Sequence, residues 1–182
     1  MGDSVTIGNG FTLLLGGARS GKSDLAVKLA TQWEGPVVFA ATAEASDDDM
    51  ATRISRHQSE RPDDWELIEA PTLRGGEVAD CDPQALVIID CITLLVNNLI
   101  FNDKTDDQID EHAKVMAHAL VSRTTPTLVI SNEVGLGVVP ETELGRRYRD
   151  VLGRYNRRLA DRAETTLFIA AGRATPLLPV AW

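Results

Sequence analysis

The sequence GGARSGKS, from Gly16 to Ser23, constrains this chain more than any other stretch, because it fits the pattern G-x-x-x-x-G-K-[ST]. An apolar run at residues 11–15 precedes it, and residues 24–30 after it carry apolar side chains at helical spacing. A strand, this loop and a helix in that order are the setting in which the pattern binds phosphate. The alternative is a glycine-rich turn before an ordinary helix, which the full match in this setting disfavours.

The loop is expected to bind a nucleoside triphosphate, since its backbone N–H groups and the following helix N-terminus can face phosphate oxygens. Lys22 would bring a positive charge to the phosphates and is a candidate catalytic residue. Ser23 is expected to hold Mg²⁺. The expected nucleotide contacts are every residue of the loop: Gly16, Gly17, Ala18, Arg19, Ser20, Gly21, Lys22 and Ser23.

Apolar, strand-like runs recur along the chain, and longer helical patterns separate most of them. Such alternation is typical of an α/β protein with a mostly parallel central sheet. Residues 86–89 and 128–130 are apolar without alternation, as expected for strands that helices cover on both faces. Residues 72–83 and 101–107 are predicted to be loops. The predicted strands are residues 11–15, 36–41, 65–69, 86–90, 127–131 and 166–171.

Length and charge limit the other possibilities. We expect residues 1–182 to form a single nucleotide-binding domain, with a flexible leader at residues 1–9. The formal net charge of −9 argues against nucleic acid as a partner. No apolar run approaches the length of a membrane span. Cys81 and Cys91 are interpreted as free thiols, which suits a reducing compartment, so a cytoplasmic protein is expected.

Residues 46–61 carry the pattern of a helix. Ser46 and Asp49 resemble a capping box at its start, and Pro62 would end it. His57 falls on the apolar face of this helix.

A longer helical pattern runs from Glu141 to about Glu164, and its flanks are rich in arginine. The favoured interpretation of the arginines is a solvated face paired with acids such as Asp150 and Asp161, and the alternative is a phosphate or subunit contact. The stripe expected to face inward is Leu144, Tyr148, Val151, Leu152, Tyr155 and Leu159.

Asp90 directly follows the apolar run 86–89, and an acid at the end of a buried strand is the form of a Walker B residue that organises Mg²⁺. A carboxylate that merely caps the next segment is the weaker alternative.

His57 has two interpretations. A lone histidine is more often packed or solvated than catalytic, but a neutral imidazole can also attack phosphorus and carry a phosphoryl or nucleotidyl group. His112 and His118 lie in an acidic helical stretch that starts near Asp106, and both are expected at the surface.

Residues 131–137, SNEVGLG, follow a predicted buried strand and contain two glycines. They lie where α/β proteins place ligands, so they suit a sensor or substrate loop. An ordinary connection to a helix that starts near Pro140 fits equally well.

Four segments together resemble one enzyme family. They are, in chain order, GGARSGKS, ATAEASDDDMATRISRHQSERPDDW, IIDCITLLVNNL and SNEVGLGVVPETELGRRYRDVLGRYNRRLA. Over nearly its whole length the chain resembles the bifunctional adenosylcobinamide kinase/adenosylcobinamide-phosphate guanylyltransferase family of cobalamin synthesis. The resemblance implies phosphorylation of the aminopropanol hydroxyl of adenosylcobinamide by ATP or GTP, then transfer of GMP from GTP to that phosphate to give adenosylcobinamide-GDP. It also implies a RecA-like P-loop NTPase fold and a homotrimer.

The resemblance assigns residue roles as well. The histidine of the RISRH motif is His57, which in this family carries the guanylyl group as a covalent intermediate. The further nucleotide contacts that the resemblance implies are Ala41, Thr42, Ala43, Gln58, Ser59, Glu60, Arg61, Glu69 and Asp90.

Two other functions stay open on the residues alone. One is a small-molecule kinase that uses the loop without a covalent intermediate. The other is a nucleotide-dependent switch or assembly module that is not an enzyme. Both retain the loop and give His57 no chemical role.

Overall fold

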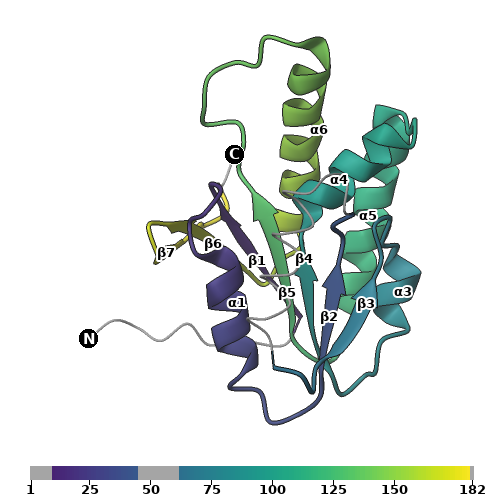
Figure 1. Cartoon of the computed structure of the whole chain (residues 1–182), viewed down its shortest axis with the longest axis vertical. Helices are drawn as coiled ribbons and strands as arrows, with labels where there is room; N and C mark the ends of the chain where they lie inside the picture. Colours follow the sequence, from purple (N-terminus) through teal and green to yellow (C-terminus); the bar gives the residue numbers. More distant parts are fainter. Residues whose placement is uncertain (1–9, 45–61, 181–182) are drawn as a thin grey trace.

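The computed structural model describes residues 10–44 and 62–180 (Figure 1). Within these residues, seven strands form one sheet in the order β3-β2-β4-β5-β1-β6-β7, and every neighbouring pair is parallel except β6 with β7. The predicted leader at residues 1–9 and the predicted helix at 46–61 lie outside the described part. The strands are β1 (Phe11–Gly16), β2 (Val37–Ala41), β3 (Glu66–Glu69), β4 (Leu86–Asp90), β5 (Thr127–Asn132), β6 (Thr165–Ala170) and β7 (Arg173–Pro176).

Helices pack on both faces of this sheet (Figure 1). Successive residues of β4 alternate between the two cores: Val87 and Ile89 belong to one, and Leu86 and Ile88 to the other. Because all four are fully buried, β4 has no polar face, which confirms the interpretation of its unbroken apolar run. The helices are α1 (Lys22–Ala30) on one face, and α3 (Gly75–Ala79), α4 (Ile92–Phe101), α5 (Asp106–Ser122) and α6 (Glu143–Ala160) on the other.

The prediction of a loop at residues 72–83 is wrong in part, because α3 lies within it. The glycine pair at its start suggests a turn, but Gly75 serves close packing against α5. A Cβ on Gly75 would come within 3.0 Å of the Val115 carbonyl oxygen. The Arg74 N–H also donates to Glu77 Oε2 at 2.6 Å, which satisfies one of the unpaired donors at the helix start.

Helix α6 is shorter than predicted, and its inward stripe begins later. Leu144 is 48% exposed, so its assignment to the stripe is wrong. The first turns of α6 extend beyond the ends of the strands, where no sheet lies beneath them (Figure 1). From Val151 onward the stripe is buried as predicted, through Leu152, Tyr155 and Leu159.

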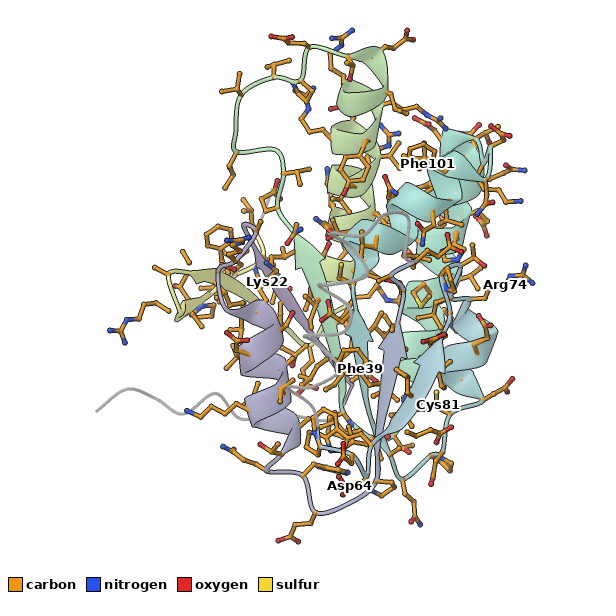
Figure 2. All side chains as sticks on the ribbon, viewed as in Figure 1. Lys22, Phe39, Asp64, Arg74, Cys81 and Phe101 are labelled. Carbon is orange, nitrogen blue, oxygen red and sulfur yellow. The ribbon has the colours of Figure 1, made fainter. Side chains whose placement is uncertain are left out.

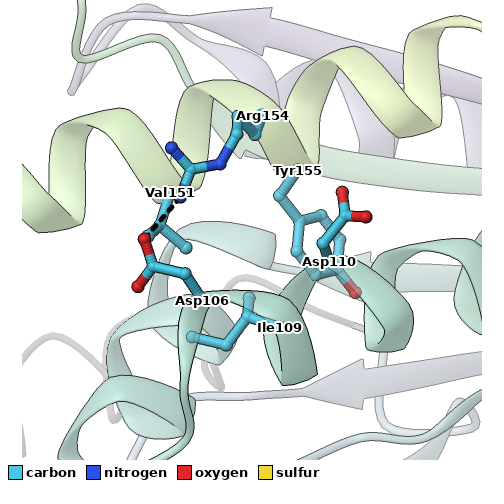
Figure 3. Close-up of a pocket in the computed structure, with 6 residues that line it drawn as sticks. All are labelled: Asp106, Ile109, Asp110, Val151, Arg154 and Tyr155. Carbon is cyan, nitrogen blue, oxygen red and sulfur yellow. Dashed lines mark hydrogen bonds and ion pairs between the residues drawn. The ribbon is translucent and has the colours of Figure 1, made fainter.

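The arginines of α6 bind acids mainly on α5. Arg147 and Arg154 both donate to Asp106, at 2.8 and 2.6 Å, and Arg158 donates to Asp110 at 2.8 Å. Figure 3 shows a hollow between α5 and α6 that Asp106, Asp110 and Arg154 border. It is too narrow to hold a ligand. These three arginines are therefore ion-paired, as predicted, but with acids on α5 and not with Asp150 or Asp161.

His112 is not the surface residue that the sequence suggested. It is partly buried where α6 packs on α5, and its Nδ1 lies 3.0 Å from the Tyr155 hydroxyl oxygen. Burial lowers the pKa of this imidazole. His118, further along α5, is exposed as expected.

None of the helices within the described ranges combines the length and the apolar character needed to cross a membrane.

Candidate functional site

The loop between β1 and α1 lies at the carboxyl edge of the sheet, at the upper edge in Figure 1. Lys22, labelled in Figure 2, begins α1, and its side chain turns back over the loop. Its Nζ donates to the carbonyl oxygens of Gly16 and Gly17, at 3.1 and 2.6 Å, and lies 3.2 Å from Ser20 Oγ. The ammonium group is thus held at the centre of the loop.

Lys22 is only 6% exposed. Burial lowers the pKa of its ammonium, while the negative charge of the nearby Asp90 carboxylate acts in the opposite direction. A buried cation of this kind interacts strongly with an anion that enters the loop, because little water screens the pair.

Gly16 ends β1 at a point where no side chain fits. Its φ is +154°, and a Cβ there would lie 2.1 Å from the Ile169 carbonyl oxygen on β6. Glycine therefore lets the loop leave the sheet directly beside its neighbour strand.

We expect Gly16→Ala to lower the free energy of unfolding by about 2–3 kcal/mol, because the backbone of β1 or β6 must shift to relieve this contact. Urea denaturation checks the expectation. The matched control is Gly17→Ala, where an added Cβ meets nothing within 4 Å. Equal unfolding midpoints for the two variants would contradict the close approach at Gly16.

Ser23 and Asp90 meet across the sheet edge. Ser23 Oγ, in the first turn of α1, donates to Asp90 Oδ2 at the end of β4, at 3.0 Å. A hydroxyl and a carboxylate oxygen are hard ligands of the type Mg²⁺ prefers, and that ion needs few protein ligands when phosphates supply the others. This pair fits Mg²⁺. Within residues 10–44 and 62–180, no three His, Cys, Asp or Glu side chains gather as a metal cluster.

Thr42 ties the turn after β2 to the turn after β4. Its Oγ1 donates to the Cys91 carbonyl oxygen at 2.7 Å and accepts from the Cys91 N–H at 2.8 Å. Its own N–H donates to the Asp90 carbonyl oxygen, and its carbonyl accepts from Asn98 Nδ2. The side chain is fully buried, so Thr42 uses its polar groups to hold the Asp90–Cys91 peptide, which is cis.

Ala41 and Glu69 share this edge with Asp90. Ala41 is paired in register with both, and Ala43 follows, partly buried. Glu69 is exposed at the end of β3, and the strand order places β3 four strands from β1. Successive strands are about 4.8 Å apart, so Glu69 stands roughly 19 Å along the sheet from the loop.

Both cysteines carry free thiols, as predicted. Burial, assisted by the Asp90 carboxylate, raises the pKa of the Cys91 thiol to about 12. Cys91 therefore lies in the site as a neutral side chain.

Five of the predicted site residues lie outside the described part of the chain. They are His57, Gln58, Ser59, Glu60 and Arg61.

Two polar residues near the site were missed by sequence reasoning. Thr93 Oγ1 accepts from the Asn132 N–H at 2.8 Å, and Asn156 Nδ2 donates to the Asn132 carbonyl oxygen at 3.0 Å. Asn156 Oδ1 also accepts from Ser131 Oγ at 2.6 Å. Helices α4 and α6 thus fix the carboxyl end of β5. The sequence feature that could have revealed this contact is Asn156, a polar residue next to the apolar stripe of α6.

The turn between β6 and β7 was also missed. The Gly172 N–H donates to the Ser20 carbonyl oxygen at 2.9 Å, so the turn braces the middle of the loop.

This sheet order, with the loop after β1 and Asp90 at the end of β4, defines a RecA-like P-loop NTPase fold. Solved structures support the same class. One of them, an ATPase domain, superposes with a TM-score of 0.53 at 14% identity, covering 88% of this chain and 69% of that one. The RadB recombinase superposes with a TM-score of 0.50 at 15% identity, covering 89% and 75%. At these identities the likeness concerns the fold alone.

The chain belongs to the cobinamide kinase / cobinamide phosphate guanyltransferase family, whose sequence profile matches residues 12–177. It is 37% identical to the bifunctional adenosylcobalamin biosynthesis protein CobP of Pseudomonas aeruginosa, over 91% of this chain and 95% of the relative. It is 35% identical to the bifunctional adenosylcobalamin biosynthesis protein CobU of Escherichia coli, over 88% and 95%. The chain is therefore an enzyme of a family that joins a kinase and a guanylyltransferase activity.

Proposed function

We propose that this enzyme phosphorylates the aminopropanol hydroxyl of adenosylcobinamide, with ATP or GTP as the donor, and then transfers GMP from GTP to the new phosphate. The product is adenosylcobinamide-GDP, an intermediate of cobalamin biosynthesis. The observation that carries this proposal is the Ser23–Asp90 contact beside buried Lys22, in a chain of this family. It is a site for the phosphates of a nucleotide and for Mg²⁺.

The loop residues from Gly16 to Ser23 bind the triphosphate through backbone N–H groups, and Lys22 stabilises the charge that moves onto the leaving group. Ser23 and Asp90 hold Mg²⁺, which when bound supplies positive charge to the phosphate oxygens. Ala41 and Ala43 line the same edge of the sheet. Thr42 acts by positioning, since its buried polar groups hold the backbone of Asp90 and Cys91.

His57 is the nucleophile of the second reaction. One imidazole nitrogen forms a bond to the α-phosphorus of GTP, the bond from that phosphorus to the α–β bridging oxygen breaks, and pyrophosphate leaves. The phosphate of adenosylcobinamide-phosphate then takes the guanylyl group and frees the histidine. Arg61 pairs with phosphate oxygens, and Glu69 accepts hydrogen bonds from the guanine edge. Gln58, Ser59 and Glu60 complete the nucleotide contacts.

A homotrimer in the cytoplasm is the form we propose for the working enzyme, on the basis of the family resemblance. No nucleic acid takes part.

Acceptor-dependent turnover tests the proposed function. Adding adenosylcobinamide to enzyme, Mg²⁺ and GTP or ATP is expected to raise nucleoside diphosphate release at least tenfold above the rate without acceptor. Adding adenosylcobinamide-phosphate with GTP is expected to release pyrophosphate. A generic small-molecule kinase would give the first result without the second, and a nucleotide-dependent switch would give neither.

A further inference from the structure

The kinase reaction needs a group that takes the proton of the acceptor hydroxyl, and none of the residues assigned above does so. The carboxyl edge of the sheet carries the acids available for this task. Among the described residues, acids follow or end the strands at Glu44, Glu69, Asp90 and Glu133. Asp90 is engaged by Ser23 and is assigned to Mg²⁺.

The other three acids lie at different distances from the loop, because their strands occupy different places in the sheet. Glu133 directly follows β5, which pairs with β1, the strand that leads into the loop. Glu44 follows β2, three strands from β1, and Glu69 ends β3, four strands away. At about 4.8 Å per strand, Glu133 is the acid of this group that stands next to the loop.

Hydrogen bonds show that the backbone of Glu133 lies beside Lys22. Its backbone N–H donates to the Gly16 carbonyl oxygen at 3.1 Å, and Lys22 Nζ donates to the same oxygen, also at 3.1 Å. Because the two donors share one acceptor atom, the Glu133 backbone adjoins the ammonium group that faces the phosphates. Behind it, Asn132 is held by Thr93 and Asn156, so this end of β5 is fixed in place.

The Glu133 side chain is held as a carboxylate acceptor at the start of the loop to α6. Its Oε1 accepts from the Gly135 N–H at 2.6 Å, and the side chain is partly exposed. The bond occupies one oxygen of a group that has two, so a carboxylate held in this way can still take a proton.

We propose that Glu133 is the general base of the kinase reaction, an inference that rests on the proposed function. The acceptor hydroxyl oxygen forms a bond to the γ-phosphorus, and the bond from that phosphorus to the β–γ bridging oxygen breaks. The nucleoside diphosphate leaves with the electron pair of that bond. The hydroxyl proton passes to the Glu133 carboxylate and from there to water.

The second reaction does not need this base. Its acceptor is a phosphate monoester, which is largely ionised near neutral pH because its second pKa is about 6. The two half-reactions therefore differ in whether a proton must be removed, and Glu133 serves only the first.

Glu133→Gln tests this assignment, since an amide oxygen can still accept from the Gly135 N–H but the amide cannot act as a base. We expect kcat of the kinase reaction to fall about 10²- to 10³-fold while KM for the nucleotide stays within about threefold. Guanylyl transfer to supplied adenosylcobinamide-phosphate should keep the wild-type rate. Glu133→Asp is expected to recover at least tenfold of the lost kinase rate, because it restores a carboxylate.

The matched control is Glu141→Gln, an exposed acid in the same connection between β5 and α6, which should leave both reactions unchanged. A Glu133→Gln enzyme with a kinase rate within threefold of wild type would overturn the assignment. Equal loss of both half-reactions would overturn it too, because that result means a change in loop shape. Failure of the proposed function itself looks different, since the wild-type enzyme would then lack acceptor-dependent turnover.

Discussion

Replacing Lys22 with methionine is expected to slow both half-reactions, each by about 10²- to 10³-fold. The ammonium group lies within 3.2 Å of three oxygen atoms of the loop, and so stands where phosphates would be cradled. Methionine is similar in length but carries no charge. Under the proposed function both reactions expel a phosphate leaving group from this loop, so both are expected to lose the same stabilisation. Steady-state rates with adenosylcobinamide and with adenosylcobinamide-phosphate measure the two effects separately.

Lys28→Met is the matched control, because Lys28 lies near the end of the same helix and is exposed. It should leave both rates within about twofold of wild type. Thermal denaturation of both variants shows whether the fold is intact. If Lys22→Met slowed the kinase reaction alone, the two reactions would not share this loop.

His57→Asn is expected to slow guanylyl transfer alone. Removing a nucleophile from a covalent mechanism costs about 10⁴-fold or more, so guanylyl transfer should fall below detection. The kinase reaction should stay within about threefold of wild type, because it involves no histidine adduct. Rates of the two half-reactions, assayed with separately supplied acceptors, check this.

His118→Asn serves as the control for His57, since His118 is an exposed histidine on α5. The His118→Asn enzyme should carry out both half-reactions at the wild-type rates. A His57→Asn enzyme that still transferred GMP at a tenth of the wild-type rate would show that another group carries out the transfer.

The strands could be predicted from the sequence because their apolar residues fit only one kind of environment. All six predicted strands are present, with ends shifted by one residue at most, because a run such as 86–89 has no polar face and fits only the centre of a covered sheet. Helix α3 was missed because it packs on α5, where Gly75 adjoins Val115, a residue 40 positions further along the chain. Leu144 was misassigned because periodicity does not reveal where the sheet beneath a helix ends.

Site residues that belong to a local sequence pattern could be predicted, but contacts between distant segments could not. Ser23 and Asp90 were each chosen from local sequence, and the structure brings their oxygens to 3.0 Å. By contrast, the contacts of Thr42 with Cys91 and of Glu133 with Gly16 depend on which strands are neighbours. Strand order is a tertiary property, so no local pattern contains it.

The most direct measurement is to incubate the wild-type enzyme with Mg²⁺ and GTP labelled at the α-phosphorus, quench, and map the label on the protein. We predict one labelled peptide, which contains His57, with a linkage stable to alkali and labile to acid, as expected for a phosphoramidate. Adding adenosylcobinamide-phosphate before the quench should move the label from the protein into adenosylcobinamide-GDP. A protein that acquires no label, or whose label lies on another residue and does not pass to the acceptor, would contradict the covalent transfer proposed here.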